Sequence, residues 1–264
     1  TVTATGTAPF TDQWRKGSAN LANGVTGNGS TIAGATTATL TVTNTQLADA
    51  GNFDVVVANG INPDTTSAVA VLTVSAVATP STVAWNFGAG AGTESAAPTS
   101  GLPADVTGGT VTSGNNNGTT TLVTAVSVSN TYSGFSAGNN AGAAARVGAL
   151  NPAAAGSAFF QFTLTPAANK QLSVSALTFG NRSTGTGPQA YSVFSSADNY
   201  TTAIATGTIS ANSAWALHSP AFTAVSGTTG TALTFRIYGH SGAGSPGANT
   251  ANWRIDDLAV QLTT

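Results

Sequence analysis

Cysteine and methionine are both absent from this chain of 264 residues. Without cysteine there are no disulfides, no thiolate metal ligands and no cysteine nucleophile. Charge is also scarce, because charged residues make up only 6% of the chain, with seven Lys and Arg against nine Asp and Glu. Phosphate backbones and anionic lipid surfaces are bound through many positive charges. We therefore expect no nucleic-acid binding and no polybasic attachment to membranes.

Long apolar runs and helical periodicity are missing as well. No run approaches the roughly 18 apolar residues of a membrane helix, so we expect no membrane insertion. No window repeats apolar residues at helical spacing, and the one helix-like piece, 46–50, is too short to be more than a turn. What the chain does contain is short runs of Val, Thr, Leu and Phe between clusters of Gly, Asn, Ser and Pro. This pattern predicts an all-β protein.

Alternating apolar and polar residues mark the individual strands. The clearest predicted strands are 39–43, 70–74, 160–164, 172–174, 190–194 and 233–238. Between the second and third of these, the small residues around Pro80 cannot build a core and predict a linker at 76–82. The chain thus divides into a first domain at 1–75 and a larger second domain at 83–264.

The first domain carries two motifs at a fairly specific spacing. Gln13-Trp14-Arg15-Lys16-Gly17 is similar to the third strand of an immunoglobulin-like sandwich, with Trp14 as the core indole. Asp49-Ala50-Gly51-Asn52-Phe53-Asp54-Val55 is similar to the family's Asp-x-Gly-x-Tyr-x-Cys stretch. The domain therefore resembles the immunoglobulin-like modules of large bacterial surface proteins. The resemblance places the family's two cysteines at about Val2 and Val55 and its corner tyrosine at Phe53, so the disulfide and the hydroxyl bond are both replaced.

On this resemblance, residues 1–5 already form the second strand and the first strand is missing. A sandwich without its first strand has an open sheet edge and an uncovered strip of core. One explanation is truncation of the chain or disorder of the preceding residues. The other is that a neighbouring copy supplies the strand by β-augmentation.

The second domain opens with Trp85-Asn86-Phe87 after an apolar start and closes with Trp253-Arg254-Ile255-Asp256-Asp257 before its last apolar residues. These features resemble the jelly-roll-like modules of secreted and surface bacterial proteins, a fold that serves many functions. Leu258, Val260 and Leu262 share one face of the last strand. Under strict alternation Trp253 and Ile255 would lie on the other face, so we predict a β-bulge near Asp256 and Asp257.

Two adjacent carboxylates at a bulge suggest a calcium site, which would be the only cofactor of the protein. Calcium needs six to eight oxygen ligands, and loop carbonyls, Glu94 or Asp198 could add to Asp256 and Asp257. The alternative is structural: one aspartate pairs with Arg236 or Arg254 and the other accepts hydrogen bonds from turn amides. Both interpretations remain open at the level of sequence.

Catalytic patterns are weak throughout. Glu94 is the only glutamate, and adjacent aspartates cannot face each other across a cleft as a glycosidase requires. His218 and His240 are the only imidazoles, and a serine triad would require one of them beside a nucleophile. We expect His240 to be a solvated loop residue and the protein to be no enzyme.

Two classes of function remain. The first is an extracellular structural or adhesive subunit of a bacterial surface filament, whose partner is another copy of the chain bound through the open edge of the first domain. A surface of hydroxyls and amides with little charge suits permanent packing. The alternative is a carbohydrate-binding module of a secreted or surface protein, with glycans as partners and Trp215 as the ring available for stacking.

Overall fold

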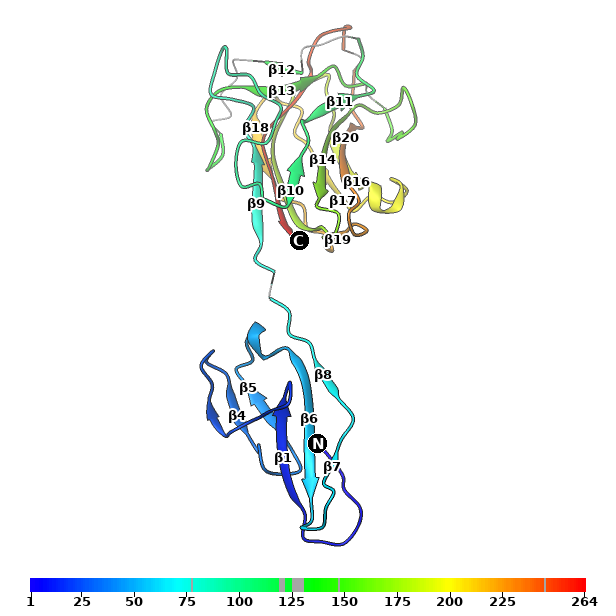
Figure 1. Ribbon diagram of the computed structural model, residues 1–264. Coiled ribbons are helices and arrows are strands. Elements are labelled where there is room, and N and C mark those ends of the chain that lie inside the picture. The colour runs from blue at the N-terminus through cyan, green and yellow to red at the C-terminus, as the bar shows by residue number, and fades with distance from the viewer. Residues whose placement is uncertain (77, 119–121, 125–130, 147, 245) are drawn as a thin grey trace. The chain divides into compact units, whose positions relative to one another are not determined.

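The computed structural model describes residues 1–76, 78–118, 122–124, 131–146, 148–244 and 246–264. The chain forms two compact units, Thr1–Val77 and Ala78–Thr264, drawn from blue to cyan and from cyan to red in Figure 1. Apart from two short 3₁₀ turns, η1 (Leu47–Asp49) and η2 (Ser196–Asp198), the regular elements are strands paired in an antiparallel sense. The protein is therefore all-β. Among the described residues, no helix is long or apolar enough to cross a lipid bilayer.

The first unit contains two small sheets. One has the order β2-β1-β6-β7, with β8 also paired to β6, and the other has the order β3-β4-β5. Their strands are β1 (Thr11–Lys16), β2 (Ala19–Asn20), β3 (Gly24–Val25), β4 (Thr31–Ala33), β5 (Thr41–Thr43), β6 (Gly51–Ala58), β7 (Thr65–Thr66) and β8 (Ala70–Leu72).

The core of the first unit forms around the two motifs singled out in the sequence. Trp14 on β1 lies opposite Val55 on β6, and both side chains are buried together with Phe53. The indole nitrogen of Trp14 donates a hydrogen bond to the carbonyl oxygen of Thr37 at 2.8 Å, so its one polar atom is satisfied. The prediction of a strand at residues 1–5 is wrong. That segment forms no regular strand, and the amide of Val2 makes a single backbone bond, to the carbonyl of Ala38.

The second unit is built on two larger sheets. One has the order β10-β14-β20-β16-β17, with β11 also paired to β14; the other has the order β12-β13-β21-β15-β18, with β19 paired to β15 and β9 to β21. Their strands are β9 (Ser81–Trp85), β10 (Val106–Gly108), β11 (Thr112–Gly114), β12 (Val123–Thr124), β13 (Asn140–Ala143), β14 (Phe159–Pro166), β15 (Ser173–Ser183), β16 (Ala190–Ser195), β17 (Ala205–Thr208), β18 (Trp215–His218), β19 (Val225–Ser226), β20 (Leu233–His240) and β21 (Trp253–Thr263).

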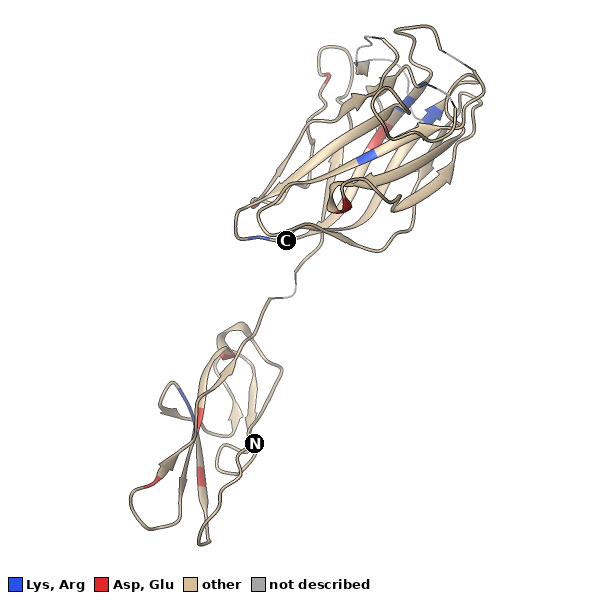
Figure 2. Cartoon of the chain, turned by 90° about the vertical axis from the view of Figure 1, so that its right-hand side faces the viewer, with Lys and Arg blue, Asp and Glu red and all other residues tan. Residues whose placement is uncertain are grey.

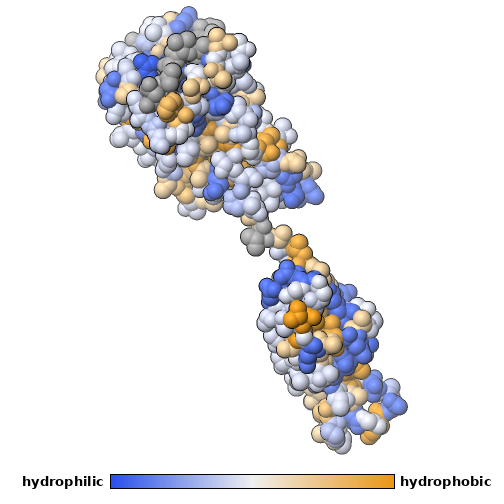
Figure 3. Space-filling model, turned by 90° about the vertical axis from the view of Figure 1, so that its left-hand side faces the viewer, coloured by the Kyte–Doolittle hydropathy of each residue, from blue (hydrophilic) through white to orange (hydrophobic). Residues whose placement is uncertain are grey.

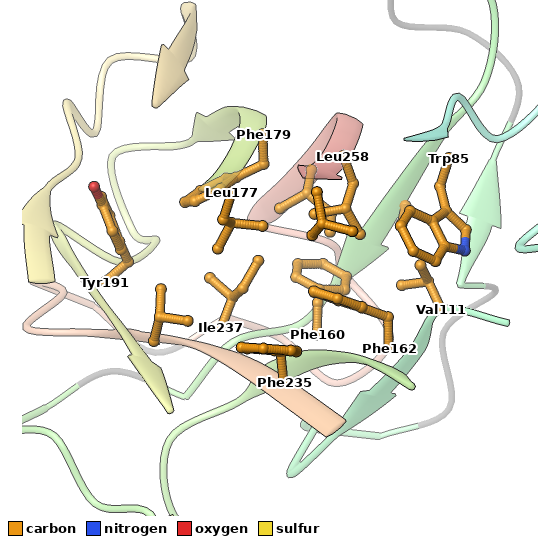
Figure 4. Close-up of a cluster of buried hydrophobic side chains, with 14 of the residues drawn as sticks. Trp85, Val111, Phe160, Phe162, Leu177, Phe179, Tyr191, Phe235, Ile237 and Leu258 are labelled. Carbon is orange, nitrogen blue, oxygen red and sulfur yellow. The ribbon is translucent and has the colours of Figure 1, made fainter. Parts of the chain in front are cut away.

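Inward-facing side chains of the two larger sheets form one core. Aromatic residues dominate it: the rings of Trp85 and Phe162 lie 5.2 Å apart, and Phe162 stacks on Phe235 at 5.3 Å. Trp85 and Tyr191 lie at opposite ends of the cluster in Figure 4. Strand β9 begins at Ser81, so the last two residues of the predicted linker are the first two residues of this strand.

Candidate functional site

The inner face of β6 in the first unit is covered along only part of its length. Alternation places Phe53, Val55 and Val57 on the same face of this strand. Phe53 and Val55 are buried, whereas Val57 is only half-buried. Ala70 on β8 lies opposite Phe53, faces the same way and is exposed. The core of this unit is therefore open beside β8 and toward the end of β6.

A groove of about 600 Å³ occupies this opening. Val57 and Phe10 contribute apolar surface, and the remaining walls come from residues 2–5 and from the segment between β6 and β7. In the N-terminal wall, Val2 and Ala4 are half-buried while the threonines between and beside them are exposed. This alternation is strand-like even though the segment pairs with no neighbouring strand. Two stretches of chain, residues 2–5 and the segment between β6 and β7, therefore line the groove.

Strand β7 lines the groove through Thr65 and, among the described residues, has one side without a strand partner. Within the described part of the chain, β7 and β8 pair only with β6, and β5 pairs only with β4. Three large apolar side chains near the β7–β8 edge are strongly exposed: Ile61 at 68%, Val69 at 57% and Val71 at 72%. Unpaired edges with apolar side chains are templates for the addition of another strand. We call this groove and the adjoining β7–β8 edge the open edge of the first unit.

Asp256 and Asp257 lie at the predicted bulge of β21. Thr178 pairs with Ala259 and Gly180 with Asp256, so two steps along β15 correspond to three along β21. Asp257 takes up the extra residue with a left-handed φ of +46°. The bulge resets the alternation as predicted, because Trp253, Ile255, Leu258, Val260 and Leu262 are all buried in the core.

The carboxylates at the bulge accept hydrogen bonds from the protein. Asp257 accepts from the hydroxyl of Tyr132 and from the amide of Ser136, at 2.9 Å for one of its oxygens. Asp256 is fully buried, and its Oδ1 accepts from the amide of Asp257 at 2.8 Å. Within the described ranges, no group of three or more His, Asp or Glu residues gathers around a common point. A calcium ion here would have to share oxygens that already hold the segment of Tyr132 and Ser136.

The other residues considered as calcium ligands lie in local turns. Asp198 accepts hydrogen bonds from the amides of Thr201 and Thr202, and Glu94 accepts one from the amide of Gly92. Arg254, considered as a partner for an aspartate, donates to the side-chain oxygen of Asn140 at 2.8 Å. Of these contacts, only that of Arg254 with Asn140 joins segments far apart in the chain, and the sequence alone could not reveal it.

Trp215 begins β18 and is only 6% exposed. A ring buried to this degree offers no face on which a sugar could stack. Thr131 donates a hydrogen bond to the carbonyl oxygen of Trp215, and the next residue, Tyr132, donates to Asp257. The structure therefore brings Trp215 and Asp257 against one shared segment, where they take part in packing.

Both histidines have ordered environments. His240 ends β20, and its Nε2 lies 3.0 Å from the hydroxyl of Ser192 while its Nδ1 lies 2.9 Å from that of Ser241. The expectation of a solvated loop histidine is thus wrong. Desolvation lowers the pKa of His240. In a serine triad the second ring nitrogen donates to a carboxylate; here that nitrogen meets Ser241, and no carboxylate among the described residues contacts this ring.

His218 packs between two aromatic rings in the second unit. It stacks on Phe179 at 5.4 Å and meets the edge of Tyr191 at 5.1 Å. Burial lowers the pKa of His218 because it penalises the charged imidazolium. The Nε2 atom of His218 is buried and has no partner in the described part of the chain. Desolvation thus disfavours the charged form of this half-buried histidine.

Comparison with known proteins adds little to this geometry. No protein-family model matches the sequence, and no curated protein is significantly similar to it. Among solved structures, the chain is similar to the K1 cleaved adhesin domain of Lys-gingipain from Porphyromonas gingivalis W83, with 16% sequence identity. The alignment covers 58% of this chain and 98% of that domain, with a TM-score of 0.26. A likeness this loose bears neither on the fold nor on the function.

Proposed function

We propose that this protein is a non-catalytic structural or adhesive subunit of a bacterial surface filament or fibre, and that it acts outside the cell. The observation that supports the proposal is the open edge of the first unit. There the groove exposes Val57 on the core face of β6, and the neighbouring strands β7 and β8 have an unpaired edge. We propose that an extended segment of another copy lies in this groove and completes the sandwich.

Addition of a strand would pair the free strand edge and cover the apolar side chains of the groove. Backbone groups of the added segment would pair with a free edge, and its alternate side chains would cover Val57 and Phe10. Fully burying one valine or phenylalanine side chain stabilises a structure by about 1.5–3 kcal/mol. Covering a few such side chains gives enough energy to hold subunits together, provided that the segment loses little entropy on binding.

The composition of the surface fits permanent packing. Charged residues are spread thinly over the chain, as Figure 2 shows, and the net charge is −2. In Figure 3 apolar residues are scattered among residues of intermediate hydropathy and hydrophilic ones. Copies with so little charge repel one another weakly, which favours association over a free monomer. The absence of cysteine and methionine also removes the residues that oxidise most readily.

The proposal can be tested by assembling the full chain and a groove variant side by side. Val57→Lys places a charge on the floor of the groove, and Leu47→Lys, at an exposed site on η1, is the matched control. We expect filaments in electron micrographs for the unaltered chain and for Leu47→Lys, and dispersed particles for Val57→Lys. Dispersed particles of the unaltered chain at high concentration, or filaments of Val57→Lys, would contradict the proposal.

The alternative of a carbohydrate-binding module loses its candidate residue, because Trp215 is buried. We therefore do not retain sugar binding at Trp215 as a second function.

A further inference from the structure

A cluster of aromatic rings surrounds Arg236 on the outer face of the six-stranded sheet. In β20 the side chains of Phe235 and Ile237 point into the core, so Arg236 between them points outward. Its guanidinium lies 3.9 Å from the ring centre of Tyr200 and 4.7 Å from that of Phe159. Outer faces of sheets in soluble proteins are usually polar. Here Tyr238, on the same face of β20, is fully buried and its ring lies 5.1 Å from that of Phe159, so aromatic rings cover part of this outer face.

The guanidinium is held in a fixed position. Its Nε donates a hydrogen bond to Oε1 of Gln161 at 2.8 Å, and Nη1 lies 3.4 Å from the hydroxyl of Tyr238. Phe159 can lie beside it because residue 114 is glycine: a Cβ there would lie 2.1 Å from the Phe159 ring. A side chain fixed in this way loses little conformational entropy when it binds a ligand.

Tyr200 is also fixed in place. It has a left-handed φ of +59°, and its amide donates to the carbonyl of Ser195. Asp198, three residues after Ser195, accepts the amides of the following turn and so fixes the loop that carries the ring. We call Phe159, Arg236 and Tyr200 the platform. Phe159 lies on β14, Arg236 lies on β20, and Tyr200 lies in the turn that Asp198 stabilises.

The charge of Arg236 has no carboxylate beside it. In the described part of the chain, the ion pairs are Arg15 with Asp54 and Lys170 with Asp105. The Nη2 atom of Arg236 has no hydrogen-bond partner among the described residues, and it is not one of the buried unpaired atoms. At least one edge of the guanidinium is thus open to solvent, with its donors unused.

We propose that this platform binds a carboxylate-bearing sugar, namely a uronic acid residue of an acidic polysaccharide. A guanidinium matches a carboxylate with paired hydrogen bonds. The adjoining rings offer apolar surface to the C–H face of the sugar. The hydroxyls of Thr163 and Thr234, 2.8 Å apart on the same face, provide donors and acceptors for its hydroxyl groups. Because this face belongs to the second unit, the inference is independent of the proposed function.

The probe is polygalacturonate, and fully methyl-esterified polygalacturonate is the matched control ligand because its carboxylates are converted to neutral methyl esters. Binding to the full chain is measured by titration calorimetry. We expect binding to the acid polymer, about tenfold or more weaker binding to the ester, and weakening of the acid form by added salt. No binding to polygalacturonate, or equal affinity for the ester, would overturn the proposal.

Three variants locate the site. Arg236→Gln should weaken binding about 10- to 100-fold, the range expected for the loss of hydrogen bonds to a charged group. Tyr200→Ala removes one ring from an exposed turn and should weaken binding about fivefold. Arg182→Gln, on β15 of the other sheet, should bind as the unaltered chain does. If Arg236→Gln fails to fold, the affinity of Tyr200→Ala for polygalacturonate still tests the proposed site. Unchanged affinity in Tyr200→Ala, or an equal loss in Arg182→Gln, would contradict the assignment.

Discussion

Trp253 donates its indole N–H to the side-chain oxygen of Asn181 at 3.1 Å, inside the core of the second unit. Trp253 is fully buried and Asn181 is 1% exposed. The bond joins β21 to β15, 72 residues earlier in the chain. The indole N–H of Trp85, in the same core, donates instead to the backbone carbonyl of Gly109. Both of these fully buried indoles thus have a partner for their one polar atom.

The Trp253–Asn181 bond gives a first prediction. Asn181→Ala leaves the indole nitrogen without its partner in a buried place, and an unsatisfied buried donor costs about 1–3 kcal/mol. We expect a loss of that size in the free energy of unfolding of the second unit, measured by denaturant titration. Trp253→Phe in the Asn181→Ala background removes the orphaned donor. A double-mutant cycle with no coupling between the two positions would contradict the prediction.

A second prediction concerns Gly101, which follows the bridge between Ser100 and Ala84. Its φ is +75°, and a Cβ at this position would lie 1.7 Å from the carbonyl oxygen of Thr82. Gly101→Ala therefore has to move backbone, and we expect it to destabilise the protein by about 2 kcal/mol or more. Gly185→Ala is the matched control, because it has open space and no left-handed φ, and it should change stability by less than about 0.5 kcal/mol. Equal melting temperatures of the two variants would show the prediction to be wrong.

The buried histidines predict how stability depends on pH. Desolvation lowers the pKa of His218 and of His240 in the folded protein below the ordinary imidazole value of about 6.5. The unfolded chain then binds protons at a higher pH than the folded chain does. Stability is therefore full above about pH 6.5 and falls as the pH is lowered through and below it. The free energy of unfolding should decrease between about pH 8 and about pH 5.

Substituting the two histidines one at a time separates their contributions to the pH dependence of stability. His218→Phe keeps a ring between Phe179 and Tyr191 and removes the titrating group, so the decrease toward low pH should become smaller. His240→Gln is the companion variant for the second histidine. A decrease between about pH 8 and about pH 5 that is unchanged in both variants would exclude the histidines as its cause.

A fourth prediction concerns calcium. Because Asp257 accepts bonds from Tyr132 and Ser136, we expect calcium to leave the melting temperature unchanged. Asp257→Ala should lower it, with or without calcium, since the segment of Tyr132 loses its anchor. A calcium-dependent rise in melting temperature that Asp257→Ala abolishes would favour the calcium site suggested by the sequence instead.

The strands could be predicted from local sequence because their signal is local. Strands at 160–164, 190–194 and 233–238 lie within β14, β16 and β20. The bulge at Asp256 and Asp257 could also be predicted, because the alternation of apolar residues changes phase there. The strand predicted at residues 1–5 is not formed. Their alternation is strand-like, but regular strand structure needs a continuous partner, and a sequence pattern does not show whether one is present.

The sequence by itself determined the all-β class, the neutral surface and the phase of each strand, since these follow from composition and from period-two alternation. Tertiary structure alone decided which side chains meet. It buried Trp215, left Val57 half-covered beside an open edge, and placed Arg236 between Phe159 and Tyr200. These outcomes depend on pairings between strands far apart in the chain. The alternation of apolar residues within one strand does not show which strand it will pair with. The candidate sites of this protein therefore came from the pairing of strands.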